Sequence, residues 1–292
     1  MSAGTYLLST EINCDLPLSY YKEHDVFLFS MTYTIDDCEY DVLDPKTPSL
    51  PEFYQQIAAG AMPRTSQIPV VKFAENFEKI VKTGKDILHI SFSSGLSGTY
   101  QSACIAAEEV MEKYPDRRIV VIDSLAASMG MGLLLHYAVK KRDSGASIDE
   151  LAAYVKETVP HVCHDFTVND LFHLHRGGRV SKTTAIFGSA LNIKPLLHVD
   201  DEGKLISVSK VRGRKASLNW LIDQTAEKCA AFENETIFIS HAASPDDAQY
   251  VADQIHARTG KEILIGEIGQ VIGSHSGIGT VAVFFLGESK AV

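Results

Sequence analysis

The sequence predicts an N-terminal α/β domain with a doubly wound, mostly parallel sheet, followed by a C-terminal α+β domain with a largely antiparallel sheet. Three observations lead to this prediction. Apolar runs typical of strands alternate with helical patterns through the first half of the chain. In the second half, two alternating runs flank Asp201-Glu202-Gly203 and predict a β-hairpin. The length of 292 residues favours two domains over one.

In the first half, short apolar runs predict strands and residues at helical spacing predict the helices between them. The strands are expected at Tyr6 to Ser9, Val26 to Tyr33, Ile87 to Ser93 and Arg118 to Asp123. The helices are expected at Pro51 to Ala59, Val70 to Thr83, Thr99 to Lys113 and Met129 to Arg142. Ser147 and Glu150 form a capping box that opens a further helix through Thr158. This alternation predicts a parallel sheet with helices on its faces.

The pattern changes near His161, so we expect residues 1–160 to form the first domain and residues 161–292 the second. Residues 62–82 of the first domain are expected to pack with the second. Ser244 and Pro245 predict a helix N-terminus, as N-cap and first helical residue. A helix is expected before the hairpin, at Ser181 to Leu191. After the hairpin, helices are expected at Lys215 to Phe232 and Pro245 to Thr259, and strands at Thr236 to Ser240, Glu262 to Ile268 and Thr280 to Leu286.

The composition excludes several classes of function. The formal net charge of −10 argues against a general nucleic-acid binder, because no basic excess exists to displace phosphate counterions. The five cysteines are scattered and contain no Cys-x-x-Cys pair, so neither a zinc site nor a disulfide framework is expected. No segment approaches the roughly 20 apolar residues that span a bilayer, and the N-terminus lacks the features of a signal peptide. We expect a cytoplasmic protein without integral membrane association, metal or cofactor.

The most informative segment for function is Ser91-Phe-Ser-Ser-Gly-Leu-Ser-Gly-Thr-Tyr100, between a predicted strand and a predicted helix. Hydroxyl groups and backbone N–H groups gather there at a helix N-terminus, which favours an anion by about 0.3–1 kcal/mol. Gly95 and Gly98 allow a ligand to approach the backbone. The segment predicts a carboxylate or phosphate site. A well-capped helix with small residues for tight packing is the alternative interpretation.

Two further segments offer polar side chains. Pro69 is expected at the first position of a helix, with Ile68 as the N-cap, so the hydroxyls of Thr65 and Ser66 are free for another role or bond their own turn. Residues 269–280 form a glycine-rich loop in which His275 could donate a hydrogen bond to an anion or face water. No lysine completes a phosphate-binding loop here, and no Gly-x-Gly-x-x-Gly follows the first strand.

Two basic clusters stand out in an acidic protein. The first is His175-Arg176-Gly-Gly-Arg179-Val-Ser-Lys182, and the second contains Lys210, Arg212, Arg214 and Lys215. A solvated surface would explain either cluster. The presence of both indicates a docking face for an acidic or phosphate-bearing partner.

Five motifs in order resemble the DegV family of bacterial fatty-acid-binding proteins. They are Thr65-Ser-Gln, Ser93-Ser-Gly-Leu-Ser-Gly-Thr-Tyr, Asp123-Ser124 with Ser128-x-Gly130, Arg176-Gly-Gly-Arg-Val-Ser and Gly273-x-His275-x-Gly277. Their order and spacing match over nearly the whole chain. The resemblance implies an α/β and an α+β domain with one long-chain fatty acid between them. It also implies a separate fatty acid kinase that phosphorylates the carboxyl group of the acid.

The resemblance implies roles for particular residues as well. The carboxylate ligands would be Thr65 with its neighbour Ser66, a serine of the pair Ser93 and Ser94, His275, and the loop at Gly98. Ser94 is the preferred member of the pair. Contact with the kinase or its nucleotide phosphate would come from Arg179, Arg212 and Arg176. The fatty acid is the only bound molecule implied, and no cofactor or metal accompanies it.

Two other functions remain open at this point. A serine hydrolase would use Ser94 as nucleophile and His275 as base, but the chain has no Gly-x-Ser-x-Gly elbow and no evident acid to orient the histidine. A binder of another small anion follows from the helix N-terminus alone. A fatty-acid carrier without chemistry of its own is the leading hypothesis, because the hydroxyl and histidine loops lack a complete catalytic set.

Overall fold

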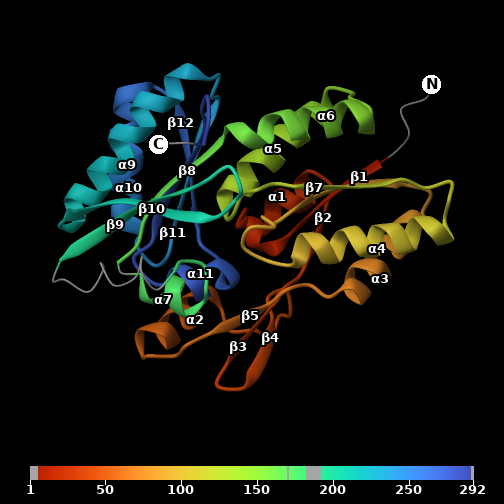
Figure 1. The fold of residues 1–292 in the computed structure, drawn as a ribbon, viewed down its shortest axis with the longest axis horizontal. Coiled ribbons are helices and arrows are strands. Elements are labelled where there is room, and N and C mark those ends of the chain that lie inside the picture. The colour runs from red at the N-terminus through yellow and green to blue at the C-terminus, as the bar shows by residue number, and fades with distance from the viewer. Residues whose placement is uncertain (1–5, 170, 182–191, 291–292) are drawn as a thin grey trace.

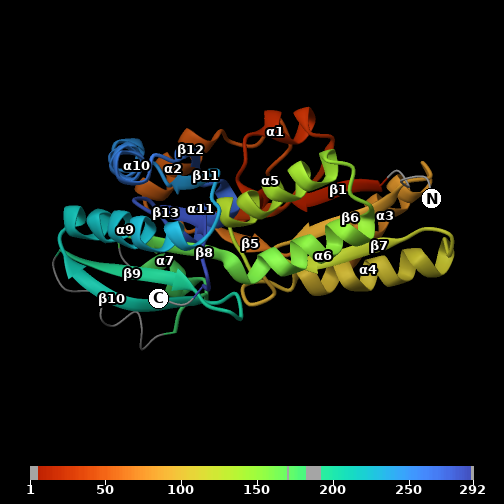
Figure 2. The ribbon, with the colours of Figure 1, turned by 90° about the horizontal axis from the view of Figure 1, so that it is seen from above.

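The structure, a computed structural model, describes residues 6–169, 171–181 and 192–290 and forms two lobes, each built on one large β-sheet (Figure 1). Viewed from above, the lobes lie side by side (Figure 2). One sheet is parallel and the other mostly antiparallel, which confirms the predicted fold class. Apart from Ser181, the helix expected at Ser181 to Leu191 lies outside the described residues.

The parallel lobe contains a sheet in the order β2-β1-β6-β7, in which every pairing is parallel. Its strands are β1 (Tyr6–Glu11), β2 (Val26–Phe29), β6 (Asp86–Ser91) and β7 (Ile119–Asp123). Its helices are α1 (Leu18–Glu23), α3 (Val70–Val81), α4 (Thr99–Lys113), α5 (Met129–Asp143) and α6 (Ile148–Thr158). Leu7 and Ile87 pack with α3 and α4, whereas their neighbours Leu8 and Leu88 pack with α5 and α6. Helices therefore cover both faces of the sheet, as in a doubly wound fold.

The order of the strands creates a crevice at one edge of this sheet. From β1 the chain continues to β2 on one side, whereas β6 continues to β7 on the other side. The reversal therefore lies between β1 and β6. At such a point the connections leave in opposite directions from the carboxyl ends of the strands, and ligands of open α/β sheets commonly bind there.

The antiparallel lobe contains a sheet in the order β10-β9-β8-β13-β11-β12, in which only β11 and β12 pair in parallel. Its strands are β8 (Val162–Thr167), β9 (Ile193–Val199), β10 (Leu205–Arg212), β11 (Thr236–His241), β12 (Glu262–Glu267) and β13 (Val281–Leu286). Its long helices are α9 (Arg214–Lys228) and α10 (Pro245–Thr259). They share a core with one face of the sheet, whereas Phe166, Phe238 and Phe284 pack in the core that contains α5.

Helix α5 joins the two lobes. Its first turns are buried on every side from Met129 to Leu135, which is typical of a helix inside a core. Leu133, Leu134 and Leu135 belong to one hydrophobic cluster with Leu88 of the parallel sheet and Phe284 of the antiparallel sheet. We propose that the domain boundary lies near residue 160, between the end of α6 and the start of β8.

A small third sheet corrects the strand expected at Val26 to Tyr33. The chain leaves the parallel sheet after Phe29, and the order of the small sheet is β4-β3-β5. Its strands are β3 (Thr32–Ile35), β4 (Cys38–Asp41) and β5 (Arg64–Ser66), and helix α2 (Leu50–Ala58) packs on it. Asp36 and Asp37 form the two-residue turn between β3 and β4 with positive φ, as a type I′ turn requires.

Several other local expectations are also corrected. Helix α3 begins at Val70, so Pro69 rather than Ile68 occupies the cap position. The glycine-rich segment expected as a loop contains helix α11 (Gln270–Ser276). His175 and Arg176 of the first basic cluster are the last residues of helix α7 (Phe172–Arg176). The chain also contains the short 3₁₀ helices η1 (Ile12–Cys14), η2 (Val159–His161) and η3 (Cys229–Ala231). Helices α7 and α11 pack against each other, and α11 also contacts β5 (Figure 1).

Candidate functional site

A cavity of about 260 Å³ lies between the two lobes, beyond the carboxyl end of β6. Most of its lining is apolar and comes from elements far apart in the sequence. The apolar lining residues are Met31, Phe92, Leu96, Ala127, Phe166, Leu174, Val199, Leu205, Ile268, Val271, Ile272, Ala282 and Phe284. The polar lining residues are Thr65, Ser66, Gln67, Ser97, Ser128, His164, Arg179, His275, Ser276 and Thr280, and Gly98 adds backbone. The site is therefore an apolar chamber with polar groups at particular places on its wall.

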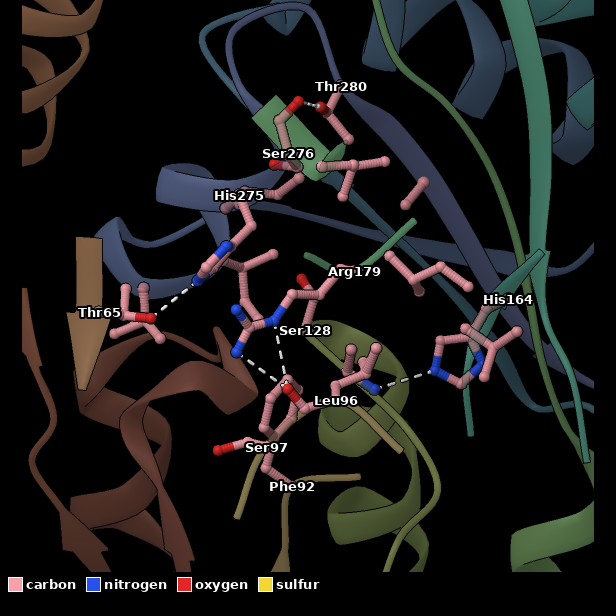
Figure 3. A pocket seen from close by; sticks show the side chains of 18 of the residues that line it. Thr65, Phe92, Leu96, Ser97, Ser128, His164, Arg179, His275, Ser276 and Thr280 are labelled. Atoms are coloured by element: carbon pink, nitrogen blue, oxygen red, sulfur yellow. Dashed lines mark hydrogen bonds between the residues drawn. The ribbon is translucent and has the colours of Figure 1, made fainter. Parts of the chain in front are cut away.

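Thr65 and His275 meet at one side of the cavity (Figure 3). Thr65 Oγ1 lies 2.7 Å from His275 Nε2, although the residues are 210 positions apart in the chain. β5 provides the threonine, and the last turn of α11 provides the histidine. A side chain at Gly177 would collide with the imidazole, so the first glycine of the Arg-Gly-Gly-Arg motif makes room for the ring.

The imidazole of His275 is neutral at pH 7. Burial lowers its pKa to about 3, and the positive charges of Arg179 and Arg176 add to this effect. Nδ1 is buried and has no hydrogen-bond partner among the described residues. If the single hydrogen is on Nε2, the ring donates to Thr65 Oγ1, and the threonine hydroxyl is left free to donate to a ligand.

Arg179 connects the two lobes at the same side of the cavity. Its Nε and Nη2 donate to the carbonyl oxygen of Leu96 at 3.2 and 3.0 Å (Figure 3), and its Nη1 donates to the carbonyl oxygen of Gly177. Burial lowers its pKa, but a guanidinium remains charged in proteins. A permanent positive charge therefore lies beside the neutral His275.

The other two predicted docking arginines lie in different surroundings. Arg176 Nη2 donates to the carbonyl oxygens of Pro63 and Ser274 at 2.8 and 3.2 Å, so this side chain joins the segment before β5 to α11. Arg212 is exposed at the end of β10. Neither residue lines the cavity.

The N-terminus of α4 faces the cavity through Ser97 and Gly98. A side chain at Gly98 would collide with Gln67, whose Nε2 donates to Ser102 Oγ at 3.2 Å. The glutamine of the Thr-Ser-Gln motif therefore packs over the start of α4 because residue 98 has no side chain. Ser97, which the sequence analysis did not select, is the hydroxyl of this loop that lines the cavity.

Ser93 and Ser94 lie outside the cavity lining. Ser93 is fully buried, and its Oγ donates to the carbonyl oxygen of Gly203 in the β9–β10 turn at 2.8 Å. Ser94 is exposed, and its N–H donates to Asp123 Oδ1 at 3.1 Å. The structure thus brings Thr65, Ser66, Gly98 and His275 to one cavity together with Arg179, and does not bring the serine pair there. His275 pairs with Thr65, so the Ser94–His275 pair of a hydrolase is not formed.

The opposite side of the cavity carries a second histidine that the sequence analysis did not select (Figure 3). His164 Nδ1 donates to the carbonyl oxygen of Val162 at 3.1 Å, and Nε2 accepts from the N–H of Ala127 at 3.2 Å. Burial lowers its pKa to about 3. This neutral ring is a fixed part of the wall. A histidine inside a strand without other motif residues gives no sequence signal for such a role.

Lowering the pH below 6.5 is expected to destabilise the fold through His275 and His164. Burial lowers both pKa values from 6.5 to about 3. Between these pH values both histidines are protonated in the unfolded chain and neutral in the folded chain. Each histidine then costs up to about 1.4 kcal/mol of stability per pH unit. Burial raises the pKa of Asp15 to about 7, which acts in the opposite direction because the folded chain holds that proton more tightly.

The variant His275→Gln isolates one of these contributions. Urea unfolding at about pH 7, 6 and 5 is expected to give a free energy of unfolding that falls less steeply with acidity in the variant than in the wild type. The same pH dependence in both proteins would contradict a neutral, buried His275.

The part of the chain that the structure describes contains no helix long and apolar enough to cross a membrane. Within residues 6–169, 171–181 and 192–290, no group of three or more His, Cys, Asp or Glu side chains could hold a metal ion. The lining of the cavity is mostly apolar and includes the charged side chain of Arg179.

Comparisons with known proteins agree on the family. The family model described as "Uncharacterised protein, DegV family COG1307" matches residues 9–288. A DegV domain-containing protein of Clostridium perfringens is 46% identical over 288 residues and covers 98% of both chains. A solved structure described as fatty acid binding of a DegV family protein from Thermus thermophilus has a TM-score of 0.85 at 26% identity, covering 97% of this chain and 99% of that one. A fatty acid binding DegV family protein from Streptococcus agalactiae has a TM-score of 0.86 at 28% identity, covering 98% of this chain and 100% of that one. The chain therefore belongs to the DegV family.

Proposed function

We propose that this chain binds one long-chain fatty acid in the cavity and presents its carboxylate to a separate fatty acid kinase, without catalysis of its own. The observation that supports this most is the cavity, in which Thr65, His275 and Arg179 form a polar side on a mostly apolar wall. The fatty acid binding described for the Thermus thermophilus and Streptococcus agalactiae proteins supports the same ligand here.

Burial of the tail provides most of the affinity. Each methylene removed from water contributes about 0.8 kcal/mol, so a chain of roughly sixteen carbons contributes on the order of 12 kcal/mol before ordering costs. The apolar wall formed by Phe92, Phe166, Phe284 and neighbouring aliphatic side chains provides the surface for this burial. A small hydrophilic anion would leave that wall without a partner, which favours a lipid over the alternative ligand.

The polar groups fix the position of the carboxylate. An ionised carboxylate buried without partners would be forced to take up a proton. When His275 carries its hydrogen on Nε2, the hydroxyl of Thr65 can donate to the carboxylate. Together with the positive charge of Arg179 and the start of α4 at Ser97 and Gly98 it can offset this cost, at about 1.5–3 kcal/mol for each hydrogen bond to a charged group. Ser66, next to Thr65 in β5, also lines the cavity. In this proposal Ser93 and Ser94 hold the loop in place rather than bind the acid.

Transfer requires a partner that meets the carboxylate. We propose that the kinase, or its nucleotide phosphate, contacts Arg176, Arg179 and Arg212. Complementary charge accelerates encounter and fixes orientation. All five cysteines are free thiols, which suits a reducing, cytoplasmic location.

Native mass spectrometry of the purified protein tests the ligand class. We expect a bound mass equal to one long-chain fatty acid, which organic solvent extracts and added palmitate restores. A copurified hydrophilic ligand, or no uptake of palmitate or oleate after extraction, would refute the proposal.

Thr65→Ala is expected to weaken palmitate binding by about tenfold or more, because it removes a hydrogen bond to a charged group. Thr65→Ser retains the hydroxyl and is expected to bind within about threefold of the wild type. Isothermal titration of the delipidated proteins measures both affinities. Equal affinity for Thr65→Ala and the wild type would exclude Thr65 as a ligand of the carboxylate.

A further inference from the structure

Strands β1 and β6 stop pairing through their backbones shortly before they reach the cavity. Their register runs from Tyr6 opposite Asp86 to Ser9 opposite His89. Beyond that point a side chain of β1 makes the hydrogen bond to β6: Thr10 Oγ1 donates to the carbonyl oxygen of Ile90 at 2.9 Å. The next residue of β1 is Glu11. It lies at the carboxyl end of β1, where the strand order reverses and the crevice forms.

The carboxylate of Glu11 is fully buried and accepts three hydrogen bonds from β6 and the residue after it. Oε1 accepts from Ser91 Oγ at 2.7 Å and from His89 Nε2 at 3.1 Å. Oε2 accepts from the N–H of Phe92 at 2.9 Å. All three partners can donate to the carboxylate, His89 when its ring carries a hydrogen on Nε2. A buried donor left without its acceptor would be costly, so this arrangement is strongly specified.

The imidazole that faces Glu11 is itself held on all sides. Phe29, Phe73 and Phe77 surround His89, with ring centroids 5.2, 5.3 and 5.6 Å away and near-perpendicular planes. Its Nδ1 lies 2.9 Å from Ser9 Oγ. The ring therefore cannot turn away from the carboxylate without disturbing a packed aromatic cluster.

Glu11 does not line the cavity, but Phe92, to which it is hydrogen-bonded, does. Phe92, whose N–H it binds, lines the cavity and begins the loop that carries Leu96, Ser97 and Gly98. In that loop the N–H groups of Leu96 and Ser97 turn back to the carbonyl oxygen of Ser93. Phe92 therefore fixes the start of the loop that carries Ser97 and leads into α4.

We infer that Glu11 is a positioning residue for recognition of the carboxylate: it anchors the loop after β6, so that Ser97 and the start of α4 face the head of the ligand. This inference rests on the proposed function. It deepens that function by adding a buried acid that acts on the ligand only through the loop.

The test compares two ligands that share a tail and differ in the head, dodecanoate and 1-dodecanol. Their affinities for the delipidated protein are measured by displacement of a fluorescent fatty acid. Glu11→Gln has nearly the same shape, but it replaces one acceptor oxygen with an amide donor that meets another donor. We expect the preference for dodecanoate over dodecanol to fall about tenfold, with dodecanol affinity within about twofold of the wild type.

A matched control separates positioning from general destabilisation. Asp165 is a buried carboxylate of the other lobe, with Oδ2 3.4 Å from Lys228 Nζ. Asp165→Asn is expected to lower the melting temperature and leave the ligand preference unchanged. Ser91→Ala removes only one of the three donors, and provides a milder variant with a smaller loss of preference if Glu11→Gln does not fold.

The outcomes distinguish this inference from the proposed function. A wild-type protein that does not bind dodecanoate would refute the proposed function itself. A wild type that prefers dodecanoate, with the same preference in Glu11→Gln and Ser91→Ala, would refute only the positioning role. Equal losses for both ligands would also refute it, because they would show that Glu11 supports the fold and not the head group.

Discussion

Replacing Ala282 with tryptophan is expected to abolish retention of a long-chain fatty acid, with affinity lowered about a thousandfold or more. Ala282 lies on β13 opposite Phe166 of β8, and both side chains line the cavity. An indole at this position would occupy space that the tail needs. Excluding roughly five methylenes at about 0.8 kcal/mol each removes about 4 kcal/mol, which corresponds to a thousandfold loss.

Native mass spectrometry after purification measures the occupancy directly, and circular dichroism reports whether the variant is folded. Ala216→Trp is the matched control, because Ala216 is exposed on α9 and the same enlargement should leave the lipid in place. Full occupancy by the same fatty acid in a folded Ala282→Trp protein would show that the tail lies elsewhere.

The large elements of the fold could be predicted because their signals are local. The capping box at Ser147 is present, with Ser147 Oγ accepting from the N–H of Glu150 and the glutamate side chain accepting from the N–H of Ser147. The hairpin around Gly203 and the helix that begins at Pro245 are also present. In each case a residue type and its neighbours decide the conformation without help from distant parts of the chain.

The elements that were missed depend on distant contacts. The sequence of β8 contains the polar residues His164, Asp165 and Thr167, so it does not have the apolar pattern of a buried strand. Every residue of β8 is nevertheless buried. Lys228 of α9 lies beside Asp165, and the carbonyl oxygen of Pro195 accepts from Thr167, so partners from later in the sequence permit the burial. Helix α11 contains Gly273, which packs against Tyr54 of α2 where a side chain would collide. A glycine selected for that approach resembles a loop glycine in the sequence.

The sequence identified segments of the chain that form the site, but it did not show which side chains of those segments face the cavity. Motif resemblance selected Thr65 and His275, which the fold brings to 2.7 Å. It also selected Ser93 and Ser94, because hydroxyls at a helix N-terminus resemble anion ligands. Which hydroxyl faces the cavity depends on the turn closed by the carbonyl oxygen of Ser93, and this turn places Ser97 there. Loop conformation of this kind is decided by tertiary contacts, and composition does not reveal it.

Replacing Arg179 with alanine is expected to lower both fatty acid affinity and transfer to the kinase, each by about tenfold to a hundredfold. The resemblance to the DegV family implies contact with the kinase alone for Arg179. Its guanidinium also lines the cavity and donates to the carbonyl oxygens of Leu96 and Gly177. The substitution removes the hydrogen bonds to Leu96 in the loop after β6, at about 1.5–3 kcal/mol per charged hydrogen bond. It also removes a positive charge that acts on His275.

Arg212→Ala separates the two roles, because Arg212 is exposed and lies outside the cavity lining. It is expected to bind palmitate as the wild type does and to slow acyl phosphate formation by a reconstituted kinase, with a stronger effect at low salt. Palmitate titration and the kinase assay on both variants distinguish anchoring from docking. If Arg179→Ala binds palmitate with wild-type affinity, the guanidinium serves only the partner, and the carboxylate must be held by Thr65 and the start of α4 alone.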